Sequence, residues 1–211
     1  MRTNFVLPVV VVIFIQMLSI LLLLPSHVAY EAIAEESVVL SDWYGTRAAD
    51  WTVGTANERF QSVFIDSGFR EWGKERFTVR TETDNALGNR IGKIFNPIMR
   101  WMGDRFNTFL NMNYLLLMRS LELLLWLPWM LCLLVPALID GAMGRKIAQT
   151  DFAYVSPVRQ QAALTAVKVS VVGTFVLFFL PIALNPFIVP AALFVTAVSM
   201  GLAMRNLHKR L

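Results

Sequence analysis

The chain has 211 residues, of which 56% are hydrophobic and only 16% charged, with a formal net charge of +4. This balance excludes a disordered chain, a collagen-like repeat and an ordinary soluble enzyme, and it indicates a membrane protein. The single cysteine excludes an internal disulfide framework, and His27 and His208 lie too far apart to suggest a metal site. We expect neither a metal nor another cofactor.

The first apolar stretch, residues 5–24, contains no charged residue. As a helix it would rise about 30 Å, which matches the hydrocarbon thickness of a bilayer, so it is predicted to be a transmembrane helix after a short N-terminal segment, residues 1–4. The only small-residue candidate for a signal-peptide cleavage site, Ala32-Ile33-Ala34, lies well beyond its end. The stretch is therefore interpreted as an uncleaved anchor.

Residues 25–114 differ sharply in composition and are predicted to form a solvated helical domain. Residues 25–112 contain 12 acidic and 10 basic residues. Apolar residues near helical spacing predict one helix over residues 28–40 and a second over residues 46–65. Gly68, Gly73 and the polar stretch 78–85 indicate loops or turns.

Residues 87–110 show the clearest helical periodicity in the chain. Large apolar residues recur at steps of three and four, with basic residues between them. The pattern predicts an amphipathic helix that continues into the next span. Its apolar stripe either packs against the other helices of this domain or lies on a lipid interface or a partner helix.

Residues 115–139 are predicted to form the second span. Pro128 and Pro136 should bend it, and Asp140-Gly141 should end it. Arg119 and Glu122 lie one helical turn apart and could pair on one face. We expect them at the outer headgroup level, where they are structural; the alternative is an ion or proton path.

The stretch 169–204 contains 36 uncharged residues, about 54 Å as one helix, which is too long for one crossing. Pro181, Asn185-Pro186 and Pro190 interrupt its centre. It is therefore predicted to form two spans, residues 169–185 and 187–204, joined by a tight turn near Asn185.

The basic residues predict the orientation of the four spans. Arg2, Arg145, Lys146, Arg159, Lys168 and the C-terminal residues 205–211 provide positive charge on one side, and the turn near Asn185 has none. By the positive-inside rule, both termini and the loop 140–168 face the cytoplasm and residues 25–114 lie outside, in the periplasm of a bacterium. The expected fold is an all-α membrane protein with four transmembrane helices and a periplasmic helical domain between the first and second.

The sequence shows no catalytic constellation, because no serine or cysteine stands beside a histidine and the acidic pairs resemble solvated helix faces. The protein is therefore expected not to be an enzyme. If it is an enzyme, the alternative is one that acts on envelope polymers through Glu31, Glu35 or Glu36.

The segments Pro136-Ala-Leu-Ile-Asp140-Gly141, Arg145-Lys146-Ile147 and Phe152-Ala-Tyr154-Val-Ser156-Pro157 resemble a known pattern. They are similar to a family of inner-membrane proteins of unknown function from integrating conjugative elements and conjugative plasmids. The resemblance implies a place near the coupling ATPase that feeds DNA to a type IV secretion channel, and it implies no reaction. Asp140, Gly141, Arg145 and Tyr154 are its candidates for shared contacts, and Arg145 and Lys146 would also contact anionic headgroups.

The resulting hypothesis is an accessory or scaffold subunit of a conjugative DNA-transfer apparatus in the bacterial inner membrane. Its expected partners are membrane lipids and the membrane part of the coupling ATPase or another conjugation subunit. An oligomer is compatible with the sequence, and direct contact with nucleic acid is not expected because the cytoplasmic loops are short and only modestly basic. The alternatives are a small transporter or channel and a recipient-exclusion protein.

Overall fold

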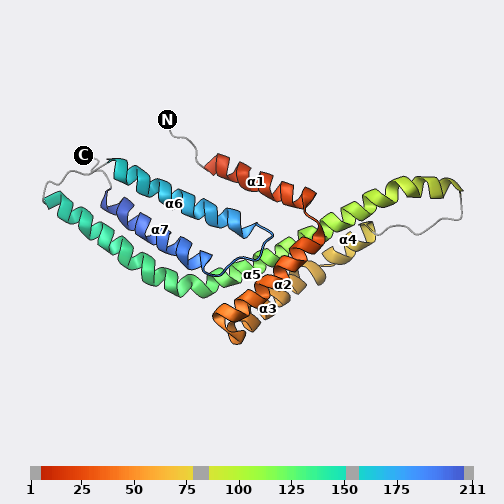
Figure 1. The fold of residues 1–211 in the computed structure, drawn as a ribbon, viewed down its shortest axis with the longest axis horizontal. Helices are drawn as coiled ribbons and strands as arrows, with labels where there is room; N and C mark the ends of the chain where they lie inside the picture. Colours follow the sequence, from red (N-terminus) through yellow and green to blue (C-terminus); the bar gives the residue numbers. More distant parts are fainter. Residues whose placement is uncertain (1–5, 78–85, 151–156, 207–211) are drawn as a thin grey trace. The chain divides into compact units, whose positions relative to one another are not determined.

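The computed structural model describes residues 6–77, 86–150 and 157–206, and within these ranges all regular secondary structure is helical (Figure 1). Contacts divide the chain into two compact units. Unit 1 comprises Met1–Leu121 and Phe179–Ala183, and unit 2 comprises Glu122–Phe178 and Leu184–Leu211.

Unit 1 begins with α1 (Val6–Leu23) and α2 (Ser26–Tyr44), which are bent by 110° relative to each other. The bend falls at Pro25, which lacks a backbone N–H and disfavours a helical conformation at the residue before it. Gly45, at a φ of 79°, then separates α2 from α3 (Thr46–Phe60). The π-helical turn η1 (Gln61–Ile65) extends α3, so the expected helices at residues 28–40 and 46–65 are both confirmed.

The core of unit 1 lies where α2, α3 and the middle of α5 (Ala86–Thr150) meet. Leu40, Ala49, Ala56 and Met118 form its buried centre. Tyr114 of α5 also donates a hydrogen bond to Asn57 Oδ1 of α3 at 2.8 Å.

Gly68, at a φ of 72°, forms the turn that leads into α4 (Phe69–Phe77). The expectation of a turn at Gly68 is confirmed, but that at Gly73 is wrong, because Gly73 lies buried inside α4. A Cβ atom at Gly73 would overlap the ring of Phe106. This glycine therefore serves close packing rather than chain reversal. The polar stretch 78–85 lies outside the described residues.

Helix α5 has 65 residues and confirms that the amphipathic segment runs directly into the second predicted span. It also corrects one expectation, because it does not end at Asp140-Gly141 but extends to Thr150; Pro128 and Pro136 both lie inside it. Its part that qualifies as a candidate membrane helix, Phe95–Ala148, has 54 residues. That is about 81 Å, so only a portion of it could lie within one bilayer.

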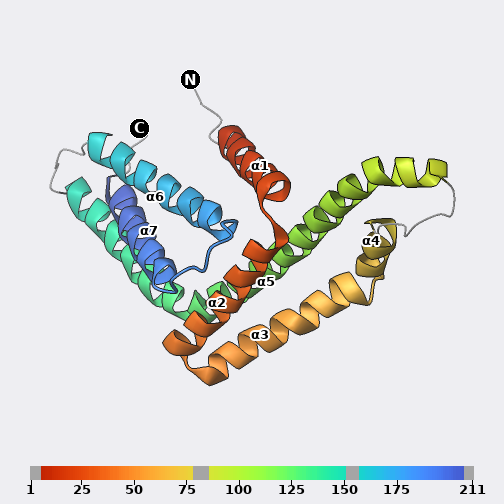
Figure 2. The same cartoon turned by 45° about the vertical axis from the view of Figure 1, so that its right-hand side comes forward.

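Unit 2 combines the end of α5 with α6 (Pro157–Phe178) and α7 (Ile188–Arg205), which lie side by side (Figure 2). The expected break in the stretch 169–204 is confirmed, but it is longer than a tight turn, because α6 ends at Phe178 and residues 179–187 are not helical. Asn185 organises the return: its Oδ1 accepts from Phe187 N at 2.9 Å and its carbonyl accepts from Ile188 N at 3.0 Å. Ser170 of α6 donates to the Ala192 carbonyl of α7 at 3.0 Å.

Three described helices are long and apolar enough to cross a membrane, namely Phe95–Ala148, Val158–Phe178 and Ile188–Arg205. The expectation of four spans is therefore corrected. The stretch Ile13–Leu23 of α1 qualifies only together with α2, as one span broken by the 110° bend. Helices also occupy much of the expected loop 140–168, because α5 ends at Thr150 and α6 begins at Pro157.

Candidate functional site

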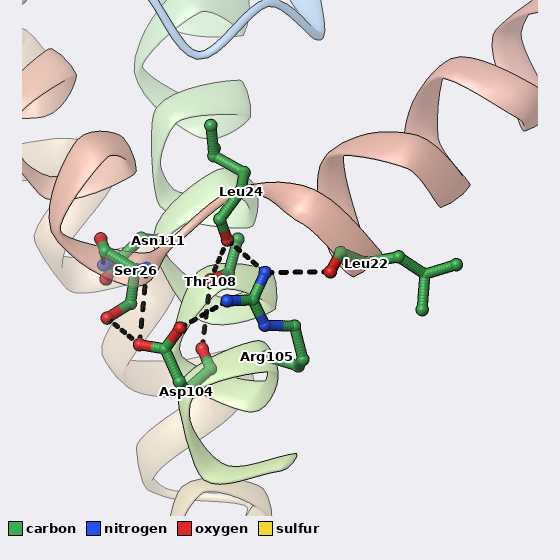
Figure 3. Close-up of polar contacts among 7 residues, drawn as sticks. All are labelled: Leu22, Leu24, Ser26, Asp104, Arg105, Thr108 and Asn111. Carbon is green, nitrogen blue, oxygen red and sulfur yellow. Dashed lines mark hydrogen bonds and ion pairs between the residues drawn. The ribbon is translucent and has the colours of Figure 1, made fainter. Parts of the chain in front are cut away.

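A polar cluster fastens the elbow between α1 and α2 to α5 (Figure 3). Arg105 Nη1 donates to the Leu22 carbonyl at 3.1 Å and to the Leu24 carbonyl at 2.6 Å. Arg105 Nη2 lies 2.6 Å from Asp104 Oδ2, and Ser26 Oγ donates to Asp104 Oδ1. Thr108 Oγ1 also donates to the Leu24 carbonyl, at 3.1 Å.

The two charges of this cluster match the two helix ends at the elbow. The last carbonyls of a helix lack partners within it and carry a partial negative charge, which Arg105 neutralises at the end of α1. The first N–H groups of a helix carry a partial positive charge, and Asp104 lies at that end of α2, where Ser26 N donates to it at 3.4 Å. Asp104 and Arg105, which are adjacent on α5, thus provide hydrogen-bond partners for the end of α1 and the start of α2.

We predict that Asp104→Ala loosens the first turn of α2. Loss of a carboxylate at a helix N-terminus costs about 1 kcal/mol, which corresponds to roughly fivefold faster exchange of the amide hydrogens in that turn. Hydrogen exchange of the purified protein measures this effect. Asp42→Ala, an exposed position of the same helix, is the matched control and should leave that exchange rate unchanged.

The second site of unit 1 is a buried ion pair between α2 and α5. Arg119 Nε donates to Glu36 Oε1 at 2.9 Å, and Arg119 Nη2 donates to Glu36 Oε2 at 2.7 Å. The two residues are only 1% and 2% exposed. This two-point geometry is the arrangement in which an arginine and a carboxylate best compensate each other's loss of water.

The same guanidinium also binds the non-helical segment that follows α6. Arg119 Nη1 donates to the Leu180 carbonyl at 2.7 Å and Nη2 donates to the Ile182 carbonyl at 2.6 Å. Non-helical backbone in apolar surroundings needs such partners, because its carbonyl groups are not satisfied by a helix. One arginine therefore holds together α2, α5 and residues 179–183.

These contacts place Arg119 and Glu122 in the interior and correct the interpretation of Glu36 as part of a solvated helix face. Arg119 and Glu122 are 1% and 4% exposed, so both side chains are buried within the protein. The carboxylate bound to Arg119 is that of Glu36, 83 residues away. Glu36 is consequently not a solvated acid, and of the three acids suggested for an envelope enzyme only Glu31 and Glu35 are exposed.

The remaining candidates lie near the end of α5, in unit 2. Asp140 and Lys146 are exposed, and Arg145 is partly buried, with an Nε atom that makes no hydrogen bond to the described residues. Gly141 is buried, and a Cβ atom there would overlap the Gly201 carbonyl of α7. The structure thus gives Gly141 a packing role, and Tyr154 lies outside the described residues.

Sequence reasoning missed Glu36, Asp104 and Arg105 as partners in these contacts. A signal for Glu36 was present: the buried positions of α2 are Ala29, Ala32, Glu36 and Leu40, so the acid interrupts an otherwise apolar face at helical spacing. Among the described residues, no three histidine, cysteine or acidic side chains are grouped so that they could hold a metal ion.

The chain is thus a helical protein whose described residues include three candidate membrane spans by length and composition. Residues 26–211 match the family described as IncC plasmid conjugative DNA transfer protein DtrJ-like, and the chain belongs to this DtrJ-like family. The match confirms the resemblance to a conjugation-associated family of unknown function. No curated protein and no solved structure matches the chain.

Proposed function

We propose that the protein is a non-enzymatic accessory subunit that scaffolds the membrane part of a conjugative DNA-transfer apparatus of the type IV secretion class. The observation that carries this proposal is the family match, which begins at the first residue of α2 and extends to the C-terminus. The described charged side chains of unit 1 support a structural role. The Arg119–Glu36 ion pair joins α5 to α2, and Asp104 and Arg105 hold the α1–α2 elbow on α5 through their hydrogen bonds to Ser26, Leu22 and Leu24.

Large exposed apolar side chains on α5 support association within a membrane. Leu124, Leu127, Trp129 and Leu131 are between 45% and 64% exposed. Such side chains need lipid or the transmembrane helices of another subunit around them. The proposed partner is the membrane part of the coupling ATPase, in the inner membrane.

The partnership can be tested by purifying the tagged protein in mild detergent from cells that carry the transfer genes. We expect the coupling ATPase to remain bound, and deletion of the gene to reduce transfer frequency. A protein that elutes alone in every detergent, from cells whose transfer does not depend on it, would refute the scaffold role. Tagged protein from cells without the transfer genes provides the background of nonspecific binding.

We also propose that α4 lies outside the cytoplasm and that the end of α5 lies inside, as the basic residues suggest. The single cysteine, Cys132, is exposed and must first be replaced by alanine. In that background Glu75→Cys and Lys146→Cys, both at exposed positions, should react with an impermeant thiol reagent from opposite sides of the membrane. Reaction of both from one side would contradict this orientation.

A further inference from the structure

An apolar groove of about 410 Å³ lies in unit 1 between the end of α1, helix α4 and the first part of α5. Phe69, Trp72 and Phe77 of α4 line it together with Trp101 and Met102 of α5 and Leu22 of α1. Phe106 forms part of the same wall, with its ring centroid 5.5 Å from that of Phe69 and 5.6 Å from that of Phe77. We call this feature the aromatic groove.

The edge of the aromatic groove combines tryptophan rings with positive charge. Trp72 and Trp101 are 50% and 48% exposed. The guanidinium carbon of Arg76 lies 5.7 Å from the Trp72 ring centroid, and that of Arg105 lies 5.7 Å from the Trp101 ring centroid. Half-exposed tryptophans beside cationic groups are typical of protein surfaces at the boundary between acyl chains and headgroups.

Arg105 is the charged residue that lines the aromatic groove, and only some of its N–H groups donate hydrogen bonds within the described residues. Its Nη atoms donate to the Leu22 and Leu24 carbonyls and to Asp104. Its Nε atom is buried and makes no hydrogen bond to the described residues. A ligand that brings an acceptor such as an ester carbonyl to this side chain would supply the missing partner.

We propose that the aromatic groove holds an acyl chain of an anionic phospholipid, with the headgroup beside Arg76. The volume lies within the range of about 300–1,000 Å³ that small-molecule sites occupy, and the apolar lining suits a hydrocarbon chain, which needs no hydrogen bonds. The charge of α4 is complementary to such a headgroup, because Arg70, Lys74 and Arg76 outnumber Glu71 and Glu75. This inference depends on the proposed membrane location and is independent of the role in DNA transfer.

The first test uses the full-length protein in phosphatidylcholine vesicles whose acyl chains carry bromine, a contact quencher of tryptophan fluorescence. The chain has six tryptophans, so each is assessed by its removal. We expect the double variant Trp72→Phe/Trp101→Phe to lose a quenched component that Trp51→Phe retains, since Trp51 is exposed on α3 and does not line the groove. Circular dichroism verifies folding, and the two single variants replace the double one if it does not fold.

A groove that faces water or a protein partner gives the opposite result and would overturn the proposal. In either case the brominated chains do not quench the fluorescence of Trp72 and Trp101. If the groove faces water, a water-soluble quencher reduces their fluorescence instead. Loss of the quenched component in Trp51→Phe alone would equally refute it. Co-purification of the coupling ATPase would be unaffected by either result, so failure here is distinguishable from failure of the proposed function.

The second test measures lipid preference. One basic residue near a charged headgroup contributes about 1 kcal/mol, or roughly fivefold in binding. Arg76→Gln should therefore lower about fivefold the ratio of phosphatidylglycerol to phosphatidylcholine that native mass spectrometry finds retained on the protein. Arg59→Gln makes the same charge change at an exposed position of α3 outside the groove and should leave the ratio unchanged. Equal ratios in the two variants would exclude a headgroup at Arg76.

Discussion

Replacing Arg119 by alanine should lower the free energy of unfolding by about 3–5 kcal/mol, the usual cost of leaving a buried charge without its partner. In this variant Glu36 loses its hydrogen bonds from Arg119 at 2.7 and 2.9 Å. The Leu180 and Ile182 carbonyls lose theirs at 2.7 and 2.6 Å. Glu36→Ala should cost less, because Arg119 would still bind both carbonyl groups. Denaturant titration of the purified protein in detergent, followed by circular dichroism, measures both losses.

The double variant Glu36→Ala/Arg119→Ala distinguishes an ion pair from two independent contributions. Removing both charges leaves no buried ion unpaired, so the double variant should be clearly more stable than the sum of the single losses predicts. Glu35→Ala, next to Glu36 but exposed, should change stability by no more than about 0.5 kcal/mol. Additive losses in the double variant would show that Glu36 and Arg119 do not stabilise each other.

The helices that the sequence predicted well are those whose limits depend on local chemistry. Gly45 separates α2 from α3, and the segment around Asn185 separates α6 from α7, because a positive φ or a proline decides the backbone locally. Local rules failed where tertiary packing overrides them. Helix α5 continues through Asp140-Gly141 to Thr150, and Gly141 packs closely against Gly201 of α7.

The candidate sites were less predictable because their partners are distant in the sequence. The spacing of Arg119 and Glu122 suggested a local pair, but it could not reveal that Arg119 also binds the carboxylate of Glu36 on a different helix. The assignment of Glu36 to a solvated face failed for the same reason: periodicity alone does not reveal whether a buried countercharge exists. The apolar stripe of α5 was partly predictable, since Phe106 and Phe109 contact Phe69 while Trp101 stays half-exposed.

Replacing Gly141 by alanine should destabilise unit 2 by about 1–3 kcal/mol, the typical cost of inserting a methyl group where no space exists. The new Cβ would overlap the carbonyl of Gly201, and it would lie 2.9 Å from the Met204 Cβ. A backbone carbonyl in a helix cannot rotate away, so α5 and α7 would have to separate. Gly201→Ala is the reciprocal change, because its Cβ would lie 2.8 Å from the Ala137 carbonyl of α5.

The graded series of glycine variants makes this prediction specific, because one chemical change meets different surroundings. Gly144→Ala should cost less than Gly141→Ala, since its nearest atom, at 3.1 Å, belongs to the flexible side chain of Arg205. Gly173→Ala meets nothing within 4 Å on α6 and should be neutral or stabilising by up to about 1 kcal/mol, as expected for alanine in a helix. Thermal unfolding in detergent would rank the four variants. A Gly141→Ala protein as stable as Gly173→Ala would mean that α7 does not pack closely on α5 at this position, and the small residues there would need a different explanation.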